Sequence, residues 1–265
     1  MSESEIAIVG AGVAGISMAS LFTQRGYDVT IFEKGMDYPY PHFPQFREEI
    51  LNLHENRDRN LGRDLKNHTI SGGYAFNLEN ERAMRTGGSA THWTAITPRM
   101  VPADFQTQTL FGYGRDWPIT YEDIEPYYCR AEEFMGISGS DQGNPFAPPR
   151  SKPYPLPPFE LSYEDRIIRE RMRSNGLSMH TRPQARTRLP FDGRPGCQNF
   201  GTCRVCPIGV RYSPNHHLER CIETGLCTVV TNASVRRIGL DSNGAARSIW
   251  YQDNDSKTIE EHGAQ

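Results

Sequence analysis

The sequence has no long hydrophobic run and no large excess of charge of one sign. No stretch reaches the roughly 18 consecutive apolar residues that a membrane-spanning helix needs. The opening MSESEIAIVG is acidic and is not a secretory signal. A formal net charge of −3 over 265 residues indicates no basic surface for nucleic acid. These absences predict a cytoplasmic globular protein with no nucleic-acid partner.

Disulfides and internal repeats are not expected either. The chain has six cysteines, but without a signal peptide they are better explained as thiols or metal ligands. No repeat or low-complexity tract occurs. The 19 prolines and 24 glycines favour long ordered loops, and 37% hydrophobic residues suffice for the core of one large or two modest domains.

Residues 1–35 carry the pattern of a dinucleotide-binding βαβ unit. An apolar strand runs directly into a glycine turn, in which Gly10 permits the tight bend, Gly12 leaves room for a pyrophosphate and Gly15 lets the helix pack closely. Glu33 follows the second strand, where a carboxylate accepts ribose hydroxyls and repels the 2′-phosphate of NADP. The pattern leaves FAD and NAD open, and its place near the chain start favours FAD.

A surface insertion is expected over 36–83, because this stretch is rich in proline and then in charge without a clear period. The next segment, 84–100, is predicted to be a ligand-contacting loop. Gly87 and Gly88 are followed by small hydroxyl residues, which let a backbone run against a flat or phosphorylated ligand. For His92, a ligand contact and a structural hydrogen bond remain open alternatives.

Three segments resemble the glucose-methanol-choline (GMC) oxidoreductase family. GGSATHWTAITPR (87–99) is similar to the flavin-contacting segment of pyranose oxidase. FGYGRDWPITYEDIEPYY (111–128) and FDGRPGCQNFGTCRVCPIG (191–209) resemble the large subunit of bacterial FAD-dependent glucose and sugar-alcohol dehydrogenases. The resemblance implies an α/β fold with a Rossmann-like FAD-binding domain, inserted helical and loop segments, and the start of an α+β substrate domain.

The resemblance also implies a chemistry. A hydride would pass from the CH–OH carbon of a sugar or other alcohol to N5 of FAD, and electrons would leave to oxygen or to an acceptor protein such as a cytochrome. His92 would lie where pyranose oxidase binds its flavin covalently, and the dehydrogenases keep a histidine there without that need. The cofactor-binding residues implied by this likeness and by the βαβ pattern are Gly10, Gly12, Gly15, Glu33, Gly87, Gly88, Ser89, Thr91, His92, Thr94 (near N5) and Val235 (backbone near the adenine).

Segment 101–190 is expected to be helical, proline-rich and on the substrate side. A helix is predicted from Thr120, as cap with Asp123 as its N3 acid, to Gly136. Its apolar stripe is expected at Ile124, Tyr127, Tyr128, Ala131 and Phe134, and its solvated face at Asp123, Glu125, Glu132 and Glu133. A second helix is predicted over 163–174, capped by Ser162.

Residues 191–227 are predicted to form a cysteine loop and a helix. Cys197, Cys203 and Cys206 follow the pattern C-x5-C-x2-C-P, and thiolates suit an iron–sulfur cluster. The dehydrogenase relatives space the second and third cysteines one residue further apart. Zinc with His216 or His217, and three plain thiols, therefore remain alternatives. The helix is expected to begin with Ser213 as cap and Pro214 at its first position.

Residues 228–265 are predicted to hold a return strand and a hairpin that turns at 241–244. By the resemblance, the hairpin strand completes the FAD sheet. The expected catalytic histidine and its His or Asn partner lie beyond Gln265 in the family, so the catalytic residues are unknown and the chain is expected to be a fragment. A non-catalytic FAD-binding remnant and an NAD-linked or disulfide-type flavin reductase are the alternatives.

Overall fold

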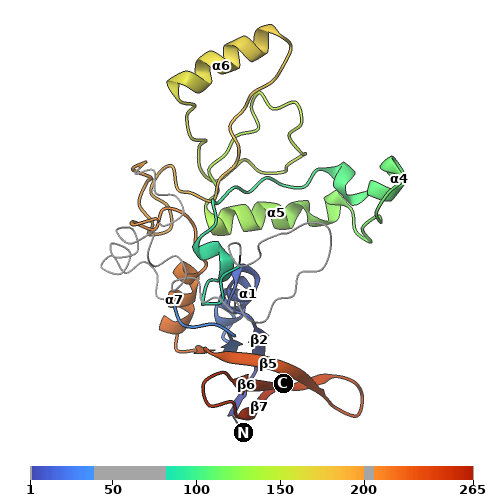
Figure 1. The fold of residues 1–265 in the computed structure, drawn as a ribbon, viewed down its shortest axis with the longest axis vertical. Helices are drawn as coiled ribbons and strands as arrows, with labels where there is room; N and C mark the ends of the chain where they lie inside the picture. Colours follow the sequence, from blue (N-terminus) through green and yellow to red (C-terminus); the bar gives the residue numbers. More distant parts are fainter. Residues whose placement is uncertain (1, 39–81, 200–205, 265) are drawn as a thin grey trace. The chain divides into compact units, whose positions relative to one another are not determined.

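The computed structural model describes residues 2–38, 82–199 and 206–264. They fall into two compact units (Figure 1). Unit 1 comprises residues 1–93, 204–207 and 213–265, and unit 2 comprises residues 94–203 and 208–212. Most of the predicted surface insertion lies in 39–81, outside the described residues.

Unit 1 contains a parallel sheet of three strands. They are β2 (Ile6–Val9), β3 (Val29–Phe32) and β4 (Cys227–Val230), with β3 in the middle. Helix α1 (Val13–Thr23) connects the first two strands. The predicted strand–turn–helix–strand unit and the return strand are therefore confirmed, and the fold class is α/β and Rossmann-like.

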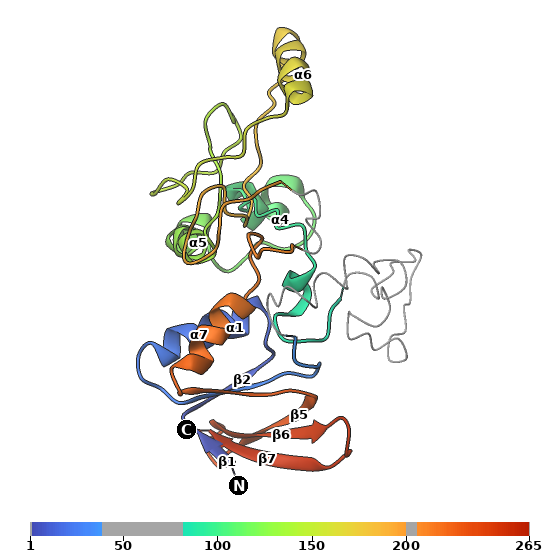
Figure 2. The ribbon, with the colours of Figure 1, turned by 90° about the vertical axis from the view of Figure 1, so that its left-hand side faces the viewer.

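Each face of the parallel sheet is covered by a different layer. On one face, α1 and α7 (Asn215–Glu223) pack with Val29 and Ile31. On the other face, Phe32 packs against residues of a second sheet. Figure 2 shows the two helices on one side of β2 and the second sheet on the other. Side chains alternate between the faces of a strand, so β3 serves both layers.

The second sheet has the order β1-β7-β6-β5. Its strands are β1 (Ser2–Ser4), β5 (Ala233–Leu240), β6 (Ala246–Asp253) and β7 (Ile259–Ala264). The predicted hairpin exists as β5 and β6, but the expectation that its strand completes the FAD sheet is wrong, because both strands pair in the second sheet and, among the described strands, it is β4 that extends the parallel sheet beyond β3. The short β1 pairs with the distant β7, a contact that local sequence patterns do not encode.

The start of α7 also differs from the prediction. The helix begins at Asn215, and Pro214 is its cap residue, with no side-chain cap bond. The hydroxyl of Ser213 instead donates to Oδ1 of Asn215, at 3.3 Å. Pro214 has helical dihedral angles, φ −63° and ψ −18°, and its carbonyl accepts the first helical bond, from the Leu218 N–H at 3.0 Å, so it occupies the cap position and the helix is counted from Asn215.

Most of the other described helices belong to unit 2. They are 3₁₀ turn η2 (Pro102–Phe105), α4 (Thr107–Phe111), α5 (Tyr121–Met135) and α6 (Tyr163–Ser174), while 3₁₀ turn η1 (Gly88–Thr91) belongs to unit 1. The capping predictions for α5 and α6 are confirmed, since Thr120 and Asp123 form a capping box, Gly136 ends α5, and Ser162 caps α6.

The predicted faces of α5 are wrong in part. Tyr127 and Ala131, expected in the apolar stripe, are exposed. Glu132, expected in solvent, is only 5% exposed, and Glu125 is mostly covered. The physical reason is that arginines from two other segments pair with these acids, so the buried face of the helix is ionic.

Within the described ranges, no helix combines the length and the apolar character needed to cross a membrane.

Candidate FAD site

The glycine turn leaves the start of α1 open to a ligand. Gly10 has φ +96°, which favours glycine, and Gly12 caps the helix without any side-chain cap bond. A Cβ added at Gly12 would meet no atom within 4 Å. A glycine turn that leads directly into the first N–H groups of a helix is the arrangement that binds a pyrophosphate.

Gly15 has a different role, which is to let the helix pack closely against the turn. A Cβ at this position would lie 2.0 Å from the carbonyl oxygen of Gly10 and 3.2 Å from Cγ2 of Ile8. The helix therefore rests directly on the turn and on β2, and only glycine permits that distance. This is the close helix packing that the spacing predicted.

Glu33 lies at the carboxyl end of β3 and is 8% exposed. Its Oε2 accepts a hydrogen bond from the Ala11 N–H at 2.8 Å, and its Oε1 accepts one from the Gly35 N–H at 2.8 Å. A carboxylate offers about four lone pairs, so two acceptor positions remain for hydroxyl groups. The side chain is thus held beside the glycine turn before any ligand arrives.

The loop that carries η1 lies directly against this turn. The N–H of Gly87 donates to the carbonyl of Ala11 at 2.7 Å, and a Cβ at Gly88 would be 3.4 Å from Cα of Gly12. Two segments far apart in the sequence, both predicted to contact the cofactor, are therefore adjacent within unit 1.

Most hydroxyl groups of this loop bond within the protein. Thr91 donates to the Gly88 carbonyl at 2.7 Å and accepts from Nε of Arg85 at 2.9 Å. Ser89 accepts a bond from the N–H of Ala83 at 3.2 Å and still has its own proton to donate. These contacts give the loop a defined shape, and direct contact of Ser89 and Thr91 with a flavin stays a prediction.

The remaining predicted cofactor residues lie around this centre or in the other unit. His92 follows η1 and is partly buried, with its N–H bonded to the Ser89 carbonyl. Val235 packs against the cluster that contains Phe32, close to the end of β3. Thr94 is exposed and belongs to unit 2. Its place near flavin N5 stays a prediction.

Two residues of this region carried no functional prediction. Arg85 is buried and stacks on the ring of Tyr38, with its guanidinium carbon 3.6 Å from the ring centroid. Asn215 is 2% exposed and bonds to both the Tyr38 and Thr86 carbonyls. Neither residue stands in a motif spacing, so only the three-dimensional structure reveals these contacts.

Comparisons with known proteins agree with this geometry. Residues 8–38 match the NAD(P)-binding Rossmann-like domain family. The chain is 28% identical to the fructose dehydrogenase large subunit of Gluconobacter japonicus, covering 96% of this chain and 50% of the relative. It is 27% identical to the gluconate 2-dehydrogenase flavoprotein of Pantoea cypripedii, covering 98% and 49%. These similarities support the resemblance to the FAD-binding portion of the GMC oxidoreductases.

Two solved structures are similar to this chain at the level of the fold. Pyridoxine 4-oxidase from Mesorbium loti has a TM-score of 0.56 and 20% identity, covering 98% of this chain and 48% of the other. Formate oxidase from Aspergillus oryzae RIB40 has a TM-score of 0.56 and 16% identity, covering 100% and 44%. The chain spans about half the length of the curated relatives it matches.

The cysteine loop is described only in part. Cys203 lies outside the described residues, and the other two cysteines belong to different units, Cys197 to unit 2 and Cys206 to unit 1. Sγ of Cys197 accepts a bond from the Asn199 N–H at 3.3 Å, and Cys206 is buried. Among the residues with described positions, no group of three or more His, Cys, Asp or Glu could hold a metal ion.

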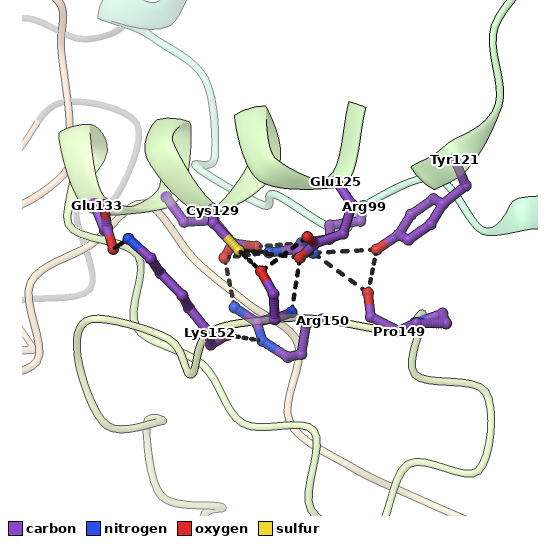
Figure 3. Close-up of polar contacts among 10 residues, drawn as sticks. Arg99, Tyr121, Glu125, Cys129, Glu133, Pro149, Arg150 and Lys152 are labelled. Atoms are coloured by element: carbon purple, nitrogen blue, oxygen red, sulfur yellow. Dashed lines mark hydrogen bonds and ion pairs between the residues drawn. The ribbon is translucent and has the colours of Figure 1, made fainter. Parts of the chain in front are cut away.

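Unit 2 is organised by a buried ionic cluster on α5 (Figure 3). Arg99 makes a two-bond pair with Glu132, Nε to Oε1 and Nη2 to Oε2, both at 2.8 Å. Arg150 adds a bond of 2.5 Å to Oε2, and Arg99 also bonds to Glu125 at 3.0 Å. Backbone donation from Ser151, followed by bonds from Cys129, Ser151 and Arg99, lowers the pKa of Glu125 to about 2.

Arg99 is the last residue of segment 87–99, which resembles a flavin-contacting segment, and the ionic cluster shows what its side chain binds. Its side chain is 1% exposed, and it ties the loop end to α5 and, through Arg150, to the proline-rich connector. The phenol of Tyr121 donates to the Pro149 carbonyl at 2.5 Å on the same connector. These acids are therefore structural ion partners and not a pair of catalytic carboxylates.

Proposed function

We propose that the full-length protein is an FAD-dependent oxidoreductase that oxidises a CH–OH group of a sugar or another alcohol. The observation that carries this proposal is the meeting of three segments: the Gly10–Gly15 turn, the Glu33 carboxylate and the Gly87–Thr91 loop. Two relatives are named as dehydrogenases of fructose and of gluconate, and these names support a polyhydroxylated substrate.

Each cofactor residue has a proposed duty that follows from its position. The first N–H groups of α1 would bind the pyrophosphate, and Glu33 would accept the ribose hydroxyls. The backbone at Val235 would border the adenine, and the η1 loop would run along the flavin side. When bound, FAD would supply a hydride acceptor at N5, near which we place Thr94.

A covalent flavin link through His92 is a finer proposal, supported by the resemblance to pyranose oxidase. The Nδ1 atom of His92 is buried, so a link would use Nε2. The test is the intact mass of the denatured protein, because a covalent flavin adds the mass of FAD to the chain. The His92→Ala variant should lose this mass, and a wild-type mass without FAD would contradict the link.

The cysteine loop supports a second finer proposal, an iron–sulfur cluster that passes electrons to an acceptor protein such as a cytochrome. Cys197, Cys203 and Cys206 lie close together in the sequence, and three such thiols suit an iron–sulfur cluster. Anaerobically purified protein should contain iron and acid-labile sulfide, and Cys203→Ser should remove both. Titration of all six cysteines as thiols in iron-free protein, or zinc in place of iron, would contradict the cluster.

The proposed activity is tested with the full-length protein purified with its flavin. Under anaerobic conditions, mixing with fructose, gluconate or a simple primary alcohol should bleach the oxidised flavin band, because the substrate reduces the cofactor. Bound FAD that stays oxidised with every such compound would favour the non-catalytic FAD-binding alternative. Bound NAD in place of FAD, or bound flavin together with redox cycling of Cys203 and Cys206, would favour the reductase alternative.

A further inference from the structure

Asn215 joins three segments that meet beside the proposed FAD site. Its Nδ2 donates to the Tyr38 carbonyl at 2.6 Å and to the Thr86 carbonyl at 3.3 Å. The residue is the first of α7 and is 2% exposed. One buried amide group therefore holds the chain after β3 and the chain before η1 to the same helix.

The orientation of this amide is set by its neighbours. Two carbonyl oxygens require donors, which only the NH₂ group can provide, and the hydroxyl of Ser213 donates to Oδ1 at 3.3 Å. The arrangement satisfies both ends of the side chain. An aspartate of the same shape would place a carboxylate oxygen against the carbonyls.

Asn215 also fills the position that a side chain at Gly87 would need. A Cβ on Gly87 would lie 1.9 Å from Oδ1 of Asn215, and Gly87 has φ +85°. Glycine is therefore required here both for its backbone conformation and for the close approach of the amide.

The contact continues into the glycine turn. The Gly87 N–H donates to the Ala11 carbonyl, and the Ala11 N–H donates to the Glu33 carboxylate. A continuous path of packing and hydrogen bonds thus runs from Asn215 through Gly87 and Ala11 to Glu33, the residue proposed to bind the ribose. A shift of the η1 loop would move the backbone on which both cofactor contacts depend.

We propose that Asn215 is a positioning residue of the FAD site, which holds the η1 loop against the glycine turn so that the loop can border the flavin. The inference rests on the proposed FAD site, but it adds a residue outside the motifs that define it. Asn215 would act through Gly87 and Thr86 and would not touch the cofactor itself.

The test compares Asn215→Asp with Asn243→Asp in the full-length protein. Asn243 lies exposed in the β5–β6 turn, so the control makes the same chemical change far from the loop in sequence. A milder variant, Ser213→Ala, removes only the hydroxyl that orients the amide. Circular dichroism and thermal melting identify which variants fold.

Three readouts separate positioning from a general loss of stability. Hydrogen exchange of the ligand-free protein should be faster over 83–93 in Asn215→Asp, since the loop loses its anchor, and unchanged there in Asn243→Asp. FAD affinity should fall at least about tenfold, because two carbonyls lose their donors. The visible spectrum of the flavin that still binds should shift, and Ser213→Ala should give a smaller effect of the same kind.

The outcomes distinguish the two proposals. Unchanged exchange over 83–93 in both Asn215→Asp and Ser213→Ala would overturn the positioning role, whatever happens to FAD. Wild-type protein that binds no FAD would instead overturn the proposed FAD site, and the inference about the cofactor with it. If the wild-type protein binds FAD and Asn215→Asp binds it with the same affinity and the same flavin spectrum, the inference alone is overturned.

Discussion

The buried ionic cluster of unit 2 makes a sharp prediction for Glu132→Gln. Glu132 accepts three bonds from two arginines, and its side chain is 6% exposed. The amide that replaces the carboxylate keeps one acceptor but points an NH₂ group at a guanidinium. Arg99, with its side chain 1% exposed, would then retain Glu125 as its only carboxylate partner among the described residues.

The magnitude follows from this burial. Breaking a buried ion pair by changing one partner costs about 3–5 kcal/mol, and we expect about 3 kcal/mol, since glutamine keeps one acceptor. For a domain of this size, that loss lowers the melting temperature by roughly 6–12 °C. The neighbouring Glu133 pairs with Lys152 in solvent, with side chains 47% and 54% exposed. Glu133→Gln should therefore lower the melting temperature far less, because solvent screens an exposed pair.

Thermal and urea unfolding of the full-length protein, followed by circular dichroism, measure both variants. The pair of substitutions is matched, because the same chemical change is made at adjacent positions of α5. Equal destabilisation by Glu132→Gln and Glu133→Gln would refute the reasoning, since it would mean that the buried cluster contributes no more than an exposed pair.

Three further predictions concern acid stability, the glycine turn and a buried thiol. The pKa of Glu125 is lowered from 4.5 to about 2, so its stabilising contribution is complete above pH 4.5 and is lost as the pH falls towards 2. Acid titration of unfolding should show this loss, and Glu125→Gln should flatten it. Gly15→Ala should destabilise the fold, because its Cβ would lie 2.0 Å from the Gly10 carbonyl, whereas Gly12→Ala should keep its melting temperature and weaken FAD binding. Equal melting temperatures for the two alanine variants would contradict this division. Burial raises the pKa of Cys227 to about 12, so iodoacetamide at pH 8 should leave this thiol unmodified in the folded protein, and peptide mass spectrometry that finds it alkylated would count against the burial.

The elements that follow local rules were predictable from the sequence. The strand and glycine turn of 6–15, and the capping box from Thr120 to Asp123, each depend on residues within one or two turns of each other. These elements can therefore be predicted without any knowledge of the fold. The same holds for the β5–β6 turn, whose Asp241 carboxylate accepts the N–H groups of Asn243 and Ala245.

The contacts that were missed join distant segments. The sequence pattern wrongly predicts that Glu132 faces solvent, because its partners, Arg99 and Arg150, come from outside its helix. Asn215 stands in no motif, and its role depends on carbonyl oxygens at Tyr38 and Thr86. A carbonyl has no sequence signature, so hydrogen bonds to backbone acceptors of remote loops cannot be found from residue spacing.

The most direct test of the FAD site compares the FAD affinity of Glu33→Gln with that of Glu5→Gln in the full-length protein. Both glutamates accept a backbone N–H in unit 1, Glu33 beside the glycine turn and Glu5 from Asp28. The site at the turn predicts at least about a tenfold loss of FAD affinity for Glu33→Gln, because hydrogen bonds to a charged acceptor are lost, and no change for Glu5→Gln. Equal FAD affinity in the two variants would contradict the assignment of the cofactor site.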